Sequence, residues 1–149
     1  MPEFAKAWKA VSETDDPACA AFVYLLTGDR AKGRHAVEKG LADISGHTML
    51  RGNRIKDGRP FFNHMHKAAM VYDWCYDLLS AEEKDAYIRE FVTFVREDHN
   101  RGYPPNADKG NPVVGHDSEG WAMTNMIPAG LAAHDEFPVL ARYASSQFN

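Results

Sequence analysis

The 149-residue sequence has only two cysteines, and it has no long uncharged apolar run. Cys19 and Cys75 lie far apart in apolar surroundings, outside any Cys-x-x-Cys or Cys/His pattern, which argues against a structural zinc site. We expect both to be buried thiols, with a disulfide between them left open. No apolar stretch approaches the length of a membrane span, and the N-terminus has no signal-peptide core. We therefore expect no membrane partner.

Positive charge is not in excess, because the formal net charge is −4. Proteins that bind nucleic acids usually show a basic balance or a basic stripe, so we expect no nucleic-acid partner. Hydrophobic residues make up 44% of the chain and charged residues 26%, an ordinary balance for a globular domain. The length is sufficient for one domain with a hydrophobic core.

The sequence also lacks the alternation of apolar and polar residues that is typical of strands. Its apolar residues recur at helical spacing instead. The patterns predict an all-α fold. We expect helices over about 3–11, 18–26, 30–44 (closed by Gly46), 61–79, from 81 onward, 118–133 (kinked or reset at Pro128) and 137–148. Asp15, Asp16 and Pro17 are typical of a helix start, and Ser80-Ala81-Glu82-Glu83 is a capping box. Because the capping box directly follows the preceding helix, those two helices should form an antiparallel hairpin that meets near Ser80.

Two loops are candidates for binding. The segment 46–60 carries Arg51, Arg54, Lys56 and Arg59 against a single acid, Asp57. Arginine forks suit sulfates and carboxylates, although a solvated loop is an equal alternative. The segment 99–117 is long and rich in Gly, Pro and Asn, and loops of that length are often functional.

The strongest candidate for chemistry is the stretch Gly115-His116-Asp117-Ser118-Glu119-Gly120-Trp121. Asp117 or Ser118 has the character of an N-cap, so His116 would lie just before a helix and Glu119 in its first turn. Both side chains can then reach an anion near the free N–H groups of the helix start. The alternative is that Glu119 only complements the helix dipole and His116 is an exposed loop residue.

A second candidate cluster is His66, Asp73 and Asp77, which share one side of the predicted long helix. Paired carboxylates can act as acid and base in glycoside hydrolysis. The alternative is that they hydrogen-bond neighbouring helix ends or pair with Arg residues. His64 and His66 are two residues apart and diverge on a helix, so we expect no metal there. Tyr103 and Trp121, like Tyr143, are candidates for stacking on sugars, although most such aromatics pack in cores.

Three segments together resemble the N-terminal domain of heparinase II-like polysaccharide lyases. They are Leu25-Leu26-Thr27-Gly28-Asp29, the stretch from Ala69-Met70-Val71-Tyr72-Asp73-Trp74 to Glu82-Glu83-Lys84, and Gly115-His116-Asp117-Ser118-Glu119-Gly120. The resemblance implies antiparallel helical hairpins that form part of an (α/α)6 toroid. It implies active-site roles only for His116 and Glu119. It also implies that the chain, with about three hairpins, is part of a larger lyase whose catalytic Tyr and second His lie beyond Asn149.

The activity implied is β-elimination on a uronic-acid polysaccharide, with heparin or heparan sulfate as the best substrate. His116 would be the base and Glu119 the neutraliser of the carboxylate. Substrate contacts would come from Arg51, Arg54, Arg59, Tyr103, Trp121 and Asn125. We expect no cofactor, an anionic polysaccharide partner, self-association or the remainder of a longer chain, and a periplasmic or secreted location. The alternatives are a glycoside hydrolase that uses Asp73 and Asp77, and a non-catalytic helical scaffold or carbohydrate-binding module.

Overall fold

The structure is a computed structural model that describes residues 2–49, 59–97 and 125–146. These residues form an all-α fold, as predicted, and no strand occurs among them. The elements are α1 (Pro2–Glu13), α2 (Pro17–Thr27), α3 (Arg30–Met49), α4 (Arg59–Trp74), the short 3-10 helix η2 (Tyr76–Leu78), α5 (Ala81–Glu97), α7 (Ile127–Ala132) and α8 (Pro138–Ser146). In this part of the chain, no helix is both long enough and apolar enough for a membrane crossing.

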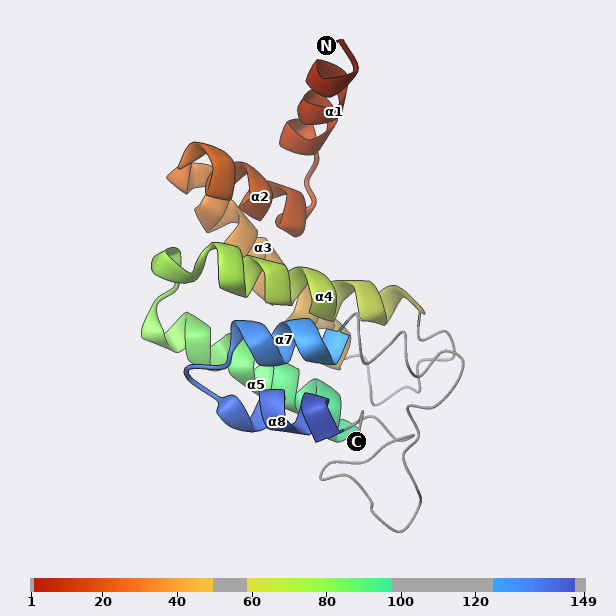
Figure 1. The fold of residues 1–149 in the computed structure, drawn as a ribbon, viewed down its shortest axis with the longest axis vertical. Helices are drawn as coiled ribbons and strands as arrows, with labels where there is room; N and C mark the ends of the chain where they lie inside the picture. Colours follow the sequence, from red (N-terminus) through yellow and green to blue (C-terminus); the bar gives the residue numbers. More distant parts are fainter. Residues whose placement is uncertain (1, 50–58, 98–124, 147–149) are drawn as a thin grey trace.

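The helices form hairpins around α4, which contacts α2, α3, α5 and α7 (Figure 1). α2 pairs with α3, α4 continues through η2 into α5, and α7 pairs with α8. α2, α4 and α7 run in the same direction side by side, while α3, α5 and α8 return. The predicted antiparallel hairpins are therefore confirmed. Closure of such hairpins into an (α/α)6 toroid stays a prediction.

Local sequence explains how α2 begins and ends. Asp16 is its N-cap, and its carboxylate accepts hydrogen bonds from the backbone N–H groups of Ala18 (2.9 Å) and Cys19 (3.3 Å). Gly28 closes the helix with a φ of 72°, and its N–H donates to the Tyr24 carbonyl at 2.7 Å. Glycine adopts this left-handed conformation without the steric cost that other residues pay.

The predicted capping box at the start of α5 is also confirmed. The Glu83 carboxylate accepts from the Ser80 N–H at 2.8 Å, and the Glu83 N–H donates to Ser80 Oγ at 3.2 Å. Two N–H groups that lack a partner within the helix are thus satisfied. The sharp start of α5 allows the chain to turn back directly after η2.

Two predicted helix ends, those of α3 and α4, differ clearly from the structure, whereas the prediction at Pro128 is confirmed. Gly46 lies inside α3, which continues to Met49. Ser45 Oγ donates to Glu90 of α5 at 3.1 Å, so a tertiary contact supports α3 where a glycine alone would favour an end. The α-helical part of α4 stops at Trp74, and the tighter η2 replaces its last turn. Pro128 lies in the first turn of α7, so the helix is reset there, as one of the two predicted outcomes.

The core is built from aromatic rings and from glycines that let helices approach. Tyr72 makes edge contacts with Tyr87 and Phe91, with ring centroids 5.8 and 6.1 Å apart. The Tyr87 hydroxyl donates to the Val37 carbonyl at 2.8 Å. A Cβ atom on Gly40 would lie only 2.7 Å from that hydroxyl oxygen, so α3 needs a glycine here.

Candidate functional site

Most of the predicted site lies outside the described residues. This applies to His116, Glu119, Arg51, Arg54, Tyr103 and Trp121. Arg59 begins α4, and only its backbone position is described. Asn125 is the predicted substrate-binding residue whose side chain is described. The roles of all these residues therefore stay predictions.

The ends of four described helices nevertheless lie at the same end of the bundle. α3 ends at Met49 and α4 begins at Arg59, on either side of the basic segment. α5 ends at Glu97 and α7 follows Asn125, on either side of the segment with His116 and Glu119. Figure 1 shows all four helix ends on one side of the molecule. The alternating direction of the hairpins thus brings these four helix ends, which flank both candidate segments in the sequence, to one end of the described body, which we call the loop end.

Asn125 lies at the loop end and is fully buried. With Met126 it adopts a π-helical conformation directly before α7. Such π turns inside or beside α-helices occur often at functional sites. Apart from the core tyrosines and Cys75, Asn125 is the one buried polar side chain among the described residues. Its amide carries both donors and acceptors, so it suits a role in orienting polar groups.

The second predicted cluster does not form a carboxylate pair on one helix. The premise that Asp73 and Asp77 share a helix is wrong, because α4 ends at Trp74 and Asp77 lies in η2. Both residues are exposed. The Tyr24 hydroxyl donates to both Asp77 oxygens, at 2.8 and 2.7 Å, and Arg30 lies 3.9 Å away. This hydrogen bond raises the pKa of Tyr24. For Asp77, the predicted pairing with an arginine is confirmed by Arg30, while the hydrogen bond from the Tyr24 hydroxyl was not predicted.

The two cysteines differ in their burial. Cys75 is fully buried, and burial raises the pKa of its thiol to about 12. Cys19 is only half-buried, so the prediction that both are buried is wrong for this residue. Both thiols are free. Among the described residues, no group of three or more His, Cys, Asp or Glu side chains is arranged to hold a metal ion.

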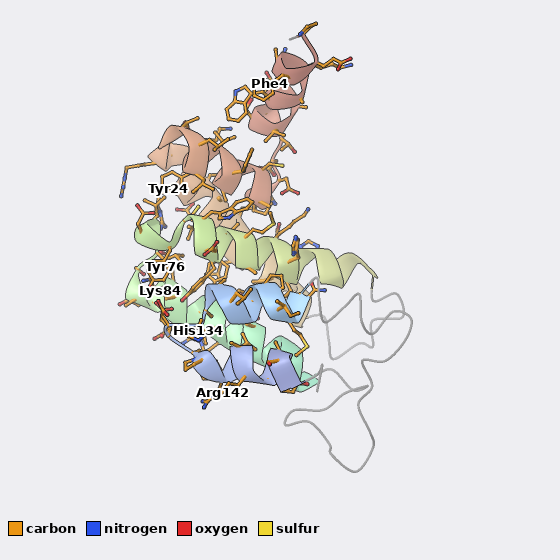
Figure 2. All side chains as sticks on the ribbon, viewed as in Figure 1. Phe4, Tyr24, Tyr76, Lys84, His134 and Arg142 are labelled. Atoms are coloured by element: carbon orange, nitrogen blue, oxygen red, sulfur yellow. The ribbon has the colours of Figure 1, made fainter. Side chains whose placement is uncertain are left out.

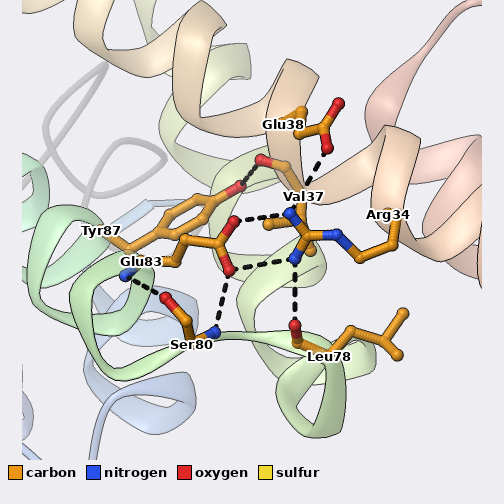
Figure 3. Close-up of polar contacts among 7 residues, drawn as sticks. All are labelled: Arg34, Val37, Glu38, Leu78, Ser80, Glu83 and Tyr87. Atoms are coloured by element: carbon orange, nitrogen blue, oxygen red, sulfur yellow. Dashed lines mark hydrogen bonds and ion pairs between the residues drawn. The ribbon is translucent and has the colours of Figure 1, made fainter.

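Figure 3 shows a polar junction that the sequence did not predict. Arg34 of α3 donates to the Leu78 carbonyl at 3.0 Å and to both Glu83 oxygens, at 3.0 and 2.7 Å. It also lies 3.4 Å from Glu38. The Arg34 guanidinium holds the pKa of Glu83 below its usual range. Because these contacts join α3, η2 and α5, we interpret the junction as structural.

A second polar cluster gathers around Glu136, in the turn between α7 and α8. The Tyr76 hydroxyl donates a short hydrogen bond to the Glu136 carboxylate. Lys84 Nζ lies 3.7 Å from Glu136 Oε1 and 3.3 Å from the centroid of the Tyr76 ring. Tyr76 and Lys84 point toward one another at the edge of the molecule (Figure 2). Burial, and then the charge of Glu136, raise the pKa of the neighbouring Tyr72. No pattern within a single helix could have revealed this cluster.

Most basic side chains of the described body are paired with acids. Besides the arginines above, Lys39 contacts Asp15 and Asp43, and Lys67 makes a short ion pair with Asp16. Paired cations offer little net positive charge to an anion. These paired cations are therefore weak candidates for binding a polyanionic ligand.

Comparisons with known proteins give no family for this chain. No model of a known protein family matches the sequence. No curated protein matches it either.

Proposed function

We propose that this chain contributes catalytic residues to a polysaccharide lyase that cleaves uronic-acid glycans by β-elimination. Heparin and heparan sulfate are the best candidate substrates. The observation that carries the proposal is the His116-x-x-Glu119 motif in its Gly-His and Glu-Gly setting. The common loop end supports it, because the helices that flank this motif and the basic segment end together there.

Each proposed residue meets one chemical requirement of β-elimination. A uronate lyase must neutralise the carboxylate at C6, remove the weakly acidic proton at C5, and let the oxygen at C4 leave with a proton. A histidine with a pKa near neutral pH suits removal of the C5 proton, so His116 is the proposed base. Glu119, in its protonated form, would donate to the developing enolate. Asn125, whose side chain is fully buried, is proposed as an additional residue that orients polar groups beside the substrate.

The charge distribution favours the basic segment as the place where an anionic glycan binds. Since most cations of the described body are already paired, the arginines of 46–60 are the better candidates. We propose that Arg51, Arg54 and Arg59 bind sulfate or carboxylate groups, because the planar guanidinium matches both groups with two hydrogen bonds. Such binding weakens as salt screens the charges.

The test is an assay for the unsaturated sugar that β-elimination leaves, detected by its ultraviolet absorbance. The full-length protein that contains this chain is incubated with heparan sulfate, heparin and alginate, with its His116→Ala variant alongside. We expect product from at least one polymer and a turnover about 10²–10⁴-fold lower in the variant, the usual range for a general base. Reducing ends without the unsaturated chromophore would indicate hydrolysis instead. Binding without any cleavage would indicate a carbohydrate-binding module, and either result would contradict the proposal.

A further inference from the structure

Glu136 joins the turn of the α7–α8 hairpin to two other parts of the chain. Tyr76, whose hydroxyl donates a hydrogen bond to the Glu136 carboxylate, belongs to η2, and Lys84 belongs to the first turn of α5. About a quarter of each side chain is exposed, 23% for Lys84 and 25% for Glu136. Polar contacts withdrawn from water in this way are stronger than those between fully exposed charges. The carboxylate therefore fastens the hairpin turn to the body.

The two helices of the hairpin pack backbone against backbone. A Cβ atom on Gly130 of α7 would lie 2.9 Å from Ala141 Cα and 3.1 Å from Ala141 N of α8. The two helix backbones thus touch without a side chain between them. Within α7 the buried residues are Ala129 and Gly130, while Met126 before it and Leu140 and Tyr143 of α8 bring larger side chains into the core. The Glu136 contacts therefore act together with this apolar packing in docking the hairpin.

Helix α7 connects the Glu136 contacts at one end of the hairpin to the loop end. Asn125 stands at the start of α7 and Ala133 at its end, a span of about 12 Å at the rise of a helix. We propose that Glu136 is a positioning residue, which acts through α7 to set the place of Asn125 at the loop end. The proposal rests on the proposed lyase function, in which Asn125 orients polar groups beside the substrate.

The first experiment measures amide hydrogen exchange in the 149-residue chain without substrate. Glu136→Ala should speed exchange across 127–146 about tenfold, because a hydrogen bond to a charged group is lost. Glu136→Gln should restore most of the protection, since its amide oxygen still accepts from Tyr76. Asp135→Asn is the matched control: its side chain is 92% exposed in the same turn and contacts His134. Equal exchange in Glu136→Ala and the unchanged protein would overturn the proposal.

The second experiment separates positioning from a general loss of stability. In the lyase assay, Glu136→Ala should raise KM about tenfold through misplacement of Asn125, while Glu136→Gln and Asp135→Asn stay within about twofold. Faster exchange with an unchanged KM would refute the connection to Asn125. If the unchanged protein cleaves no uronate polymer, the proposed function fails. Exchange at the Asn125 amide then still decides whether Glu136 sets its position.

Discussion

Arg34 and Glu83 are joined by two hydrogen bonds, of 3.0 and 2.7 Å, although 49 positions separate them in sequence. The same Glu83 carboxylate also accepts from the N–H of Ser80, so it links α3 to the start of α5. The pKa of Glu83 is lowered from its ordinary value of 4.5, first by the hydrogen bonds from Arg34. A group with a lowered pKa in the folded state stabilises the fold above its unfolded pKa. That contribution is lost as the pH falls through the folded pKa.

The first prediction is therefore an acid-dependent loss of stability at Glu83. In the unchanged protein, the free energy of unfolding should fall below about pH 4.5, and Asp16, whose pKa is also lowered, adds to the same trend. Glu83→Gln should cost about 1–2 kcal/mol at pH 7 and flatten the acid part of the profile. Urea unfolding between pH 3 and pH 7, a window of about four units around the ordinary pKa, measures both effects. An unchanged slope in Glu83→Gln would assign the pH dependence to other carboxylates.

The second prediction concerns the capping box. Ser80→Ala removes the oxygen that accepts from the Glu83 N–H, and it should cost about 1 kcal/mol. Ser80→Asp keeps an acceptor at the N-cap and adds charge that suits the helix dipole, so it should be nearly neutral. Thermal unfolding followed by circular dichroism measures the difference. Equal losses of stability in both variants would show that the hydrogen bond to Ser80 Oγ contributes nothing to stability.

The third prediction compares two glycines of α3. Gly40→Ala places a Cβ atom 2.7 Å from the Tyr87 hydroxyl oxygen. The Tyr87 ring must then shift, which strains the hydrogen bond from its hydroxyl to the Val37 carbonyl. We expect a cost of about 1–3 kcal/mol. Gly46→Ala meets nothing within 4 Å and should stabilise the helix by up to about 1 kcal/mol. The double variant Tyr87→Phe with Gly40→Ala should lose less free energy of unfolding than the sum of the losses in the two single variants. Additive losses in that double variant would argue against the contact.

Contacts between residues close in sequence were predictable, whereas contacts between distant residues were not. The Ser80–Glu83 box and the Asp16 cap act within three residues, so their pattern could be predicted. The Arg34–Glu83 junction depends on tertiary packing, which no local period encodes. Gly46 was expected to end α3, but the bond between Ser45 and Glu90 supports the helix past it. Apolar periodicity also does not separate a last α-helical turn from a 3-10 turn, which explains the error at Asp77.

The candidate site was predicted from a motif and from loop composition. Its central pair, His116 and Glu119, stays a prediction outside the described residues. The antiparallel order of the hairpins explains why the helix ends that flank both candidate segments meet, since an even number of helices returns the chain to the same end. Asn125 was proposed as a donor by its distance from the motif, but its full burial depends on how α7 packs and could not be read from the sequence.

The last prediction tests how Glu119 would act on the substrate. If Glu119 donates a proton to the developing enolate in its neutral form, Glu119→Gln retains an N–H donor and nearly the same shape. This variant should therefore lose less turnover than Glu119→Ala, for which a loss of about 10²–10³-fold is typical of a missing oxyanion donor. The measurement is kcat from the ultraviolet absorbance of the unsaturated product. Since a charged Glu119 would be required only if it acted as a base, equal losses in Gln and Ala would reassign it to proton transfer. In that case His116→Ala should retain a measurable share of turnover, and the pH profile of Glu119→Gln should lose its acidic limb.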